Sequence, residues 1–333
     1  MQMTFKRIET PCPAFSCRLS AIALLFLLMV LLAACGQTAT VADEPRNATA
    51  EASPLNVVVT TQHLGDTVAN LAQDRVELTV LFGPGIDPHT YIPTEGDLQI
   101  LQNADLIFYN GLLLEAQMGR VFTQMEQRQA TQVVAVAEAL PAERLLLWEE
   151  EEGYDPHIWK DVQLWIAATE VIRTTLMERD PANAATYEAN ANAFVAELEQ
   201  LHQDILTQIE RIPPELRVLV TAHDAFSYYG RAYGLEVEAV QGISTEAEAS
   251  AADIQAVAAI LIERQIPAIF VETTVSPRTI EAVMAAANAG GQAVRIGGEL
   301  FADDLGEPGT PEGTYIGMMR HNTDTIVAAL AGE

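Results

Sequence analysis

Three of the six histidines lie in segments that suit a binding site. His89 and His157 each close an Asp-Pro-His triplet, and His223 follows a short run rich in β-branched residues. A single histidine in such a place is more often structural, but imidazole is the commonest protein ligand for metals. Three of them at corresponding positions near predicted strand ends therefore predict an imidazole cluster that holds a metal ion.

The spacing of these histidines indicates what kind of site they form. They stand 68 and 66 residues apart, whereas zinc fingers and HExxH enzymes place two ligands within one turn or one helix. The tertiary fold must therefore assemble the site from both halves of the chain. Residues 300–306 offer a carboxylate, Asp303 or Asp304, and the alternative for this segment is a solvated acidic loop.

Four further titratable residues are weaker candidates. Glu272 ends a predicted strand, and it is either a partner to a ligating imidazole or a structural carboxylate, two hypotheses that we hold equal. His63 follows the first predicted strand and is expected to be structural. His202 is expected to face solvent on a helix, and no role is assigned to His321.

The elements that must position these residues alternate along the chain. In the first half, strands are predicted at 56–60, 77–81, 106–109 and 132–136, with helices at 64–73 and 95–103. In the second half, strands are predicted at 217–221, 236–240, 268–271 and 293–296, with helices at 254–264 and 279–289. This alternation is typical of βαβ units with a parallel sheet, where ligands bind at the carboxyl ends of the strands.

One long helical segment separates the two halves. Asp180 and Pro181 are suited to begin it, residues 182–212 contain neither Gly nor Pro, and Pro213 and Pro214 end it. These 31 residues would span about 46 Å, more than an ordinary globular helix. An apolar stripe follows the helical spacing at Phe194, Leu198, Leu201, Ile205 and Ile209. The segment predicts a stiff link between two lobes, and the alternative is two ordinary helices with an unmarked break.

Residues 1–34 have the pattern of an export signal. Lys6, Arg7 and Arg18 precede an apolar run at 19–34, which is followed by Cys35. The run is short for a membrane span, although an uncleaved anchor is the alternative. A cysteine after small residues resembles the bacterial lipobox, which implies removal of a lipoprotein signal peptide, residues 1–34, and lipidation of Cys35.

Removal of this signal would change the thiol and charge content of the chain. Cys12 and Cys17 would leave with it, so the exported protein would have no disulfide. Residues 35–54 lack a hydrophobic period and predict a flexible tether. The net charge of −28 argues against nucleic acid as a partner and against a basic patch for anionic lipid.

Six segments together resemble one protein family. They lie at 87–91, 155–159, 221–228, 242–248, 270–274 and 313–319. In this order they are similar to the zinc- and manganese-specific substrate-binding lipoproteins of bacterial ABC importers, the TroA and ZnuA type. The resemblance implies an α/β fold of two lobes with mainly parallel sheets, joined by one long rigid helix, with the metal site in the cleft between the lobes. The lobes would then be 55–180 and 213–333, and the linking helix 181–212.

The resemblance also implies the ligands and the role of the chain. It places metal ligation on His89, His157, His223 and Asp303, of which Asp303 could be confused with its neighbour Asp304. It implies an exported monomer, anchored by lipid to the outer face of the bacterial cell membrane or to a periplasmic membrane face. Its transported ligand would be a divalent metal ion, delivered to an ABC permease and an ATPase on separate chains.

The donor set favours zinc, because imidazole-rich sites suit late transition metals, while manganese and iron stay open. Neither a catalytic residue nor a resident cofactor is predicted. Two other functions are weighed against transport. One is a surface adhesin or structural lipoprotein with a metal site. The other is a zinc hydrolase, in which Glu272 would have to be the general base.

Overall fold

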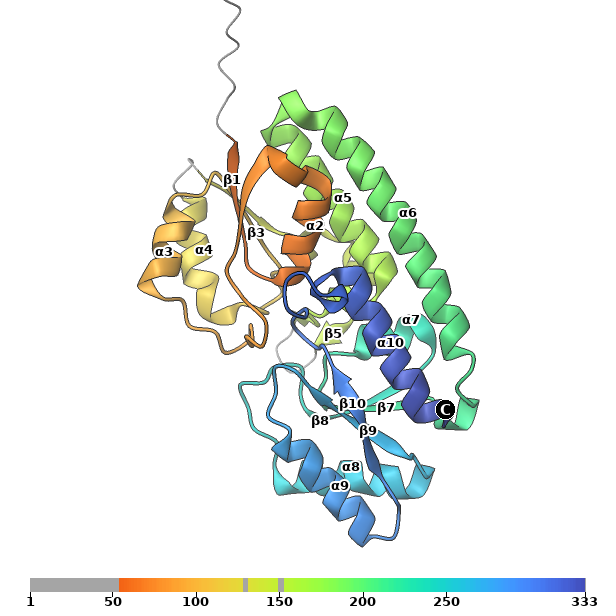
Figure 1. Ribbon diagram of the computed structural model, residues 1–333. Coiled ribbons are helices and arrows are strands. Elements are labelled where there is room, and N and C mark those ends of the chain that lie inside the picture. Colours follow the sequence, from red (N-terminus) through yellow and green to blue (C-terminus); the bar gives the residue numbers. More distant parts are fainter. Residues whose placement is uncertain (1–53, 128–130, 149–152, 333) are drawn as a thin grey trace, which may run out of the picture. The chain divides into compact units, whose positions relative to one another are not determined.

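The computed structural model describes residues 54–127, 131–148 and 153–332 (Figure 1). The predicted signal peptide, Cys35 and all but the last residue of the predicted tether lie outside the described residues. The described residues belong to one compact unit, so the predicted division at 180 and 212 stays a prediction. Within this part of the chain, no helix is both long enough and apolar enough to cross a membrane.

A four-stranded parallel sheet with the order β2-β1-β3-β4 forms the first lobe. Its strands are β1 (Leu55–Val59), β2 (Val76–Val80), β3 (Leu106–Tyr109) and β4 (Gln132–Ala135). Successive residues of a strand face opposite sides, and both sides of this sheet are buried. Val57 and Val59 therefore enter one apolar cluster and Val58 enters another. The strands confirm the predicted ranges to within a residue.

Helices cover both faces of this sheet (Figure 1). They are α2 (Gln62–Ala72) and α5 (Val162–Arg179) on one face and α3 (Glu95–Gln102) and α4 (Gly119–Glu126) on the other. A short antiparallel pair, β5 (Leu147–Trp148) and β6 (Gly153–Tyr154), precedes the second Asp-Pro-His triplet. The sequence patterns did not predict α5, because its many β-branched residues have low helix propensity. Its buried positions form a helical stripe, but Thr169 and Thr175 interrupt the apolar pattern, and Ile166 and Val171 lie outside it.

The second lobe repeats the parallel architecture in two strand pairs whose inner strands contact each other. The strands are β7 (Val218–His223), β8 (Glu236–Gln241), β9 (Ala268–Glu272) and β10 (Arg295–Leu300). The helices are α7 (Ser227–Tyr233), α8 (Ala251–Arg264), α9 (Arg278–Ala289) and α10 (Tyr315–Ala331).

The prediction for the last strand was wrong in its position. It was placed at 293–296, but β10 continues through Gly297 and Gly298 to Leu300. Glycines usually mark the end of a strand, but here the register shifts at this pair. A Cβ at Gly297 would collide with Phe270, and one at Gly298 would collide with Thr325 of α10. The glycines are needed because α10 packs directly on the strand.

The linking helix is shorter than predicted. A 3-10 turn at Pro181–Asn183 leads into α6 (Ala184–Ile209), which has 26 residues. Asp180 does not cap the turn, and its carboxylate instead accepts hydrogen bonds from the Asn183 side chain at 2.7 Å and the Tyr187 hydroxyl at 2.6 Å. All five residues of the predicted apolar stripe are buried, which confirms that prediction.

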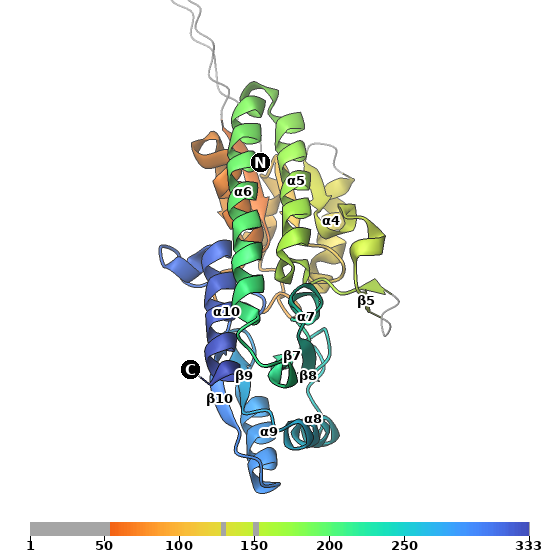
Figure 2. The ribbon, with the colours of Figure 1, turned by 90° about the vertical axis from the view of Figure 1, so that its right-hand side faces the viewer.

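Helix α6 is not an isolated link between the lobes. Figure 2 shows it beside α5 along part of its length and beside α10 further down, and the contacts agree. One apolar cluster runs without interruption through the first sheet, α5, α6 and the second lobe. Because such a core is close-packed, relative motion of the lobes must be small or must repack side chains.

The apolar stripe of α6 predicts a large stability cost for truncation. Leu198→Ala would remove a fully buried side chain and should lower the free energy of unfolding by about 2–5 kcal/mol. The neighbouring exposed Glu199→Ala should change it by less than about 0.5 kcal/mol. Urea unfolding of residues 37–333 measures both, and equal stability of the two variants would contradict the packing described here.

Candidate metal centre

The structure brings the four predicted ligands together. His89, His157, His223 and Asp303 each offer one ligand atom, and these atoms all lie within 4.8 Å of one another. No side chain of the set is more than 3% exposed. Two of the residues come from the first lobe and two from the second, so the cluster forms only when the chain is folded.

Each Asp-Pro-His triplet has a local structural purpose. The carboxylate of Asp87 accepts a hydrogen bond from the backbone N–H of His89 at 2.9 Å, and Asp155 does the same for His157 at 2.9 Å. These Asx turns fix where the two histidines leave the backbone. Asp87 also accepts the hydroxyl of Thr245 at 2.6 Å, which ties the first loop to the second lobe.

Carboxylates behind two of the rings set their orientation. Asp155 lies 2.7 Å from Nδ1 of His157, and Glu272 lies 2.5 Å from Nδ1 of His223. The other oxygen of Glu272 accepts the backbone N–H groups of Ala222 and His223 at 2.7 and 3.1 Å. With Nδ1 occupied, each ring presents Nε2 to the cluster, as metal-ligating histidines usually do. For Glu272 this geometry favours the hypothesis of a partner to a ligating imidazole.

The two adjacent aspartates differ in what their oxygens contact. Asp304 accepts the backbone N–H of Gly85 at 2.7 Å and the hydroxyl of Thr273 at 2.5 Å, so it joins the lobes. Both oxygens of Asp303 are buried and make no hydrogen bond of good geometry, and they face only the Nε2 atoms of His223 at 3.3 Å and His157 at 3.5 Å. Buried polar atoms without partners are costly and rare. A cation between these atoms would satisfy all of them.

The spacing of the donor atoms fits a small ion. Nε2 of His89 lies 3.3 Å from Nε2 of His157, which lies 3.5 Å from Oδ1 of Asp303. Nε2 of His223 lies 3.3 Å from Oδ2 of Asp303. Tetrahedral zinc with bonds of about 2.0–2.1 Å separates its ligand atoms by roughly 3.3 Å. These three separations match that edge, while other pairs of ligand atoms lie further apart, within 4.8 Å.

Burial and charge set the protonation of the empty cluster. Burial lowers the pKa of His89 to about 3, so this ring is neutral. Burial also disfavours charge on His223, but Glu272 and Asp303 outweigh it and raise the pKa of His223 well above its ordinary value. Burial opposes the charge on Asp303 too, but His223, His157 and His89 lower the pKa of this carboxyl. Without an ion, Asp303 is ionised and His223 is protonated, and the two form a charged pair at 3.3 Å that a metal ion would replace.

The remaining histidines are not members of the four-residue set. His63 is fully buried and stacks on Trp159 at 4.8 Å, in agreement with a structural place. The prediction for His202 was wrong, because its ring is half-buried and Nδ1 lies 3.3 Å from the hydroxyl of Tyr233. His321 contacts the carbonyl oxygen of Glu299 at 3.1 Å.

The sequence patterns missed two residues beside the cluster. Asp155 was visible in the repeated triplet, but only His157 was given a role there. Lys160 is fully buried three residues after His157. A count of lysines would have found it, because it is the only lysine after Lys6.

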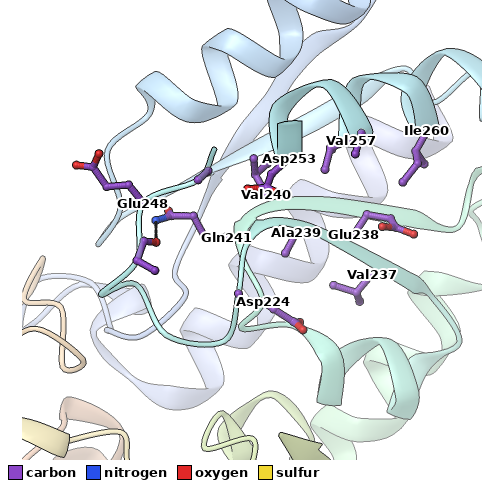
Figure 3. A pocket seen from close by; sticks show the side chains of 14 residues that line it. Asp224, Val237, Glu238, Ala239, Val240, Gln241, Glu248, Asp253, Val257 and Ile260 are labelled. Atoms are coloured by element: carbon purple, nitrogen blue, oxygen red, sulfur yellow. Dashed lines mark hydrogen bonds between the residues drawn. The ribbon is translucent and has the colours of Figure 1, made fainter. Parts of the chain in front are cut away.

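A pocket of about 530 Å³ lies elsewhere in the second lobe, between β8 and α8 (Figure 3). Asp224, which follows His223, is part of its lining, but none of the four clustered residues is. The cluster itself is closed, so a small ion fits it and an organic ligand does not.

Known proteins share this sequence and fold. The profile of the family described as zinc-uptake complex component A, periplasmic, matches residues 57–329. Zinc-binding protein TroA of Treponema pallidum (strain Nichols) is 47% identical over 286 residues, which cover 86% of this chain and 92% of that protein. Manganese-binding lipoprotein MntA of Bacillus subtilis (strain 168) is 42% identical over 277 residues, covering 83% of this chain and 90% of that protein.

A solved structure of the periplasmic zinc-binding protein TroA from Treponema pallidum has the same fold. It superposes with a TM-score of 0.81 at 46% identity, covering 83% of this chain and 99% of that chain. The family profile spans both lobes and the linking helix. The chain therefore belongs to the TroA/ZnuA-type family of zinc and manganese substrate-binding proteins of ABC importers.

Proposed function

We propose that this protein binds one divalent transition metal ion at His89, His157, His223 and Asp303 and delivers it to an ABC importer. One observation carries the proposal: four buried residues of metal-ligating type, His89, His157, His223 and Asp303, turn their ligand atoms toward one another within 4.8 Å. Family membership supports the ion as cargo and not as a resident cofactor.

Zinc is the proposed cargo, with manganese and iron as the alternatives. Three imidazoles with one carboxylate suit zinc, and three of the distances between ligand atoms, 3.3–3.5 Å, match the edge of a tetrahedral zinc site. One relative is named for zinc and another for manganese, so the family alone does not choose between them.

The partners follow from the role of the family. A binding protein of an ABC importer works with a permease and an ATPase, which would be separate chains here. We propose that lipid on Cys35 anchors this chain, as a monomer, to the outer face of the bacterial cell membrane or to a periplasmic membrane face. Relatives named as lipoproteins support the anchor.

Release of the ion would require only a modest rearrangement. Hydrogen bonds join the lobes beside the cluster, from Gly85 to Asp304 and from Trp159 to the carbonyl of Ala302. The shared apolar core further limits hinge motion. We propose that the ligand loops, and not whole lobes, move during release.

The two competing functions account for fewer of the observations. A zinc hydrolase needs an open coordination position and a free general base. Both oxygens of Glu272 are already engaged, with His223 and with backbone N–H groups. An adhesin or structural role does not require a buried four-ligand set, although it is compatible with one. We therefore propose a binding protein without catalytic activity.

Removal of one ligand should abolish tight binding. His157→Ala in residues 37–333, stripped of metal, should lose the single tightly held ion that the parent protein binds at a stoichiometry of one. His202→Ala is the matched control, since it removes a histidine on α6 outside the cluster, and it should bind normally. Native mass spectrometry during zinc and manganese titration gives both results. Equal binding by the two variants would refute the assignment of the site.

The carboxylate behind His223 should matter although it does not touch the ion. Glu272→Gln presents an amide N–H to Nδ1 of His223, which favours the tautomer with the proton on Nε2, the atom that must bind the metal. Zinc affinity should fall by about 10–100-fold. The exposed Glu281→Gln removes the same charge and should have no effect. Affinity by competition with a chelator distinguishes the two, and an unchanged Glu272→Gln affinity would show that Glu272 is only structural.

Metal binding should release a proton. Unperturbed histidines would lose affinity as the pH falls through about 6.5, but the raised pKa of His223 moves this loss to higher pH. Below that pKa a proton on His223 competes with the ion, so affinity rises with pH by up to about tenfold per unit. Near pH 7, calorimetry in buffers of different ionisation enthalpy should give about one proton released per ion. Binding without proton release would contradict the protonated His223.

A further inference from the structure

Lys160 is an unusual residue in this chain. The chain has two lysines, and the other, Lys6, lies in the predicted signal peptide, while every remaining cationic side chain is arginine. Lysine is among the residues that are rarely fully buried, yet Lys160 has no exposed surface. The only lysine of the predicted exported protein therefore lies in its interior, three residues after His157.

The side chain of Lys160 reaches from the first lobe to the second. Its Nζ donates a hydrogen bond to the carbonyl oxygen of Phe301 at 2.5 Å and lies 4.2 Å from the ring centroid of Phe226. Phe301 is two residues before Asp303. No carboxylate of the described residues lies within the 4.0 Å that define an ion pair with it. The ammonium thus lies beside the four-residue set without neutralising any one member of it.

The surroundings of Lys160 carry several titratable groups. Burial lowers the pKa of Lys160 to about 7, while Asp303, Glu272 and Asp304 act in the opposite direction. His63, from α2, lies close enough for its charge to be disfavoured by Lys160, and burial keeps that ring neutral. Lys160 is therefore positively charged below about pH 7.

Lys160 is not needed to hold the loop at Phe301 in place, because other side chains already bind the backbone there. Asn322 already binds Phe301, because its side chain accepts the backbone N–H at 2.9 Å and donates to the carbonyl at 2.8 Å. The indole of Trp159 donates to the next carbonyl, that of Ala302, at 2.9 Å. Loss of the Lys160 hydrogen bond would leave no carbonyl unsatisfied, and the loop that carries Asp303 would stay in place.

We propose that the positive charge of the Lys160 ammonium lowers the affinity of the four-residue site for a divalent cation. The lower affinity favours release of that cation to the importer. This inference rests on the proposed function. Two like charges repel strongly at short range in a site from which water is excluded, and salt screens buried charges poorly. A carrier must give up its ion, and a nearby positive charge offsets part of the attraction that four enclosing protein ligands exert on it.

Lys160→Met tests the proposal, because methionine keeps the apolar stem and removes the charge. At pH 6.5 the full-length protein in detergent should bind zinc about three- to fourfold more tightly as Lys160→Met, with a slower dissociation rate, because a lysine pKa of about 7 limits the effect at this pH to that factor. Arg231→Met is the matched control. It removes an exposed cation that lies 4.9 Å from the ring of Tyr228, and its affinity should stay within about twofold of the parent.

A second measurement uses the unmodified protein. If charged Lys160 weakens zinc binding, bound zinc must disfavour the charge on Lys160 by the same factor. In NMR spectra of protein with ¹³Cε-labelled lysine, the Lys160 signal is identified as the one that is missing from Lys160→Met. The midpoint of its titration should lie at least one pH unit lower in the zinc-loaded protein than in the metal-free protein. A lysine with a structural role alone would keep its midpoint.

The outcomes separate the two proposals. If the parent protein does not bind zinc, manganese or iron, the proposed function fails. If it binds and Lys160→Met binds equally or more weakly while remaining folded, the inference about Lys160 is wrong and its role is structural. If that variant unfolds, the lysine midpoint of the parent protein decides, and a midpoint that zinc leaves unchanged overturns the inference.

Discussion

The carboxylate of Asp303 is buried against imidazoles from both lobes, and its oxygens face only ring nitrogens, at 3.3 and 3.5 Å. Such a group is costly unless a cation completes it. Other features of the site serve this arrangement. Asp155 and Glu272 turn two rings so that their Nε2 atoms face the carboxylate, and Asp304 uses its own oxygens to join the lobes. The ion would supply the charge and the contacts that the protein leaves open.

The fold provides rigid positions for this cluster. His223 ends β7, and Asp303 follows β10 at the corresponding edge of the second lobe. A continuous core through α5, α6 and both lobes limits how far these elements can separate. A carrier must still release its ion. In a stiff scaffold the ligand loops can move, or nearby charges can weaken the binding of the ion. A buried lysine beside the ligands acts in the second of these ways.

Much of this arrangement could be predicted from residue patterns, because strands with both faces buried are short, apolar and bounded by turn residues. The prediction failed where tertiary packing overrides local signals. Gly297 and Gly298 indicated the end of a strand, but in the structure they lie within β10 and allow α10 to pack against it. Helix α5 was not predicted, because its many β-branched residues favour a strand. The histidines were visible as repeated motifs. The hydrogen bonds of Asp304 in the folded chain, which favour Asp303 as the ligand, could not be predicted from the sequence, whereas Lys160 stands out there as the one lysine after the predicted signal peptide.

The central claim is that one ion lies among His89, His157, His223 and Asp303. Anomalous diffraction at the zinc absorption edge from zinc-loaded crystals tests it most directly. A single strong peak is expected at about 2.0–2.2 Å from the three Nε2 atoms and from at least one oxygen of Asp303. A peak at another place, such as the acidic lining of the pocket beside β8, or a peak that lacks any one of these four ligands, would contradict it.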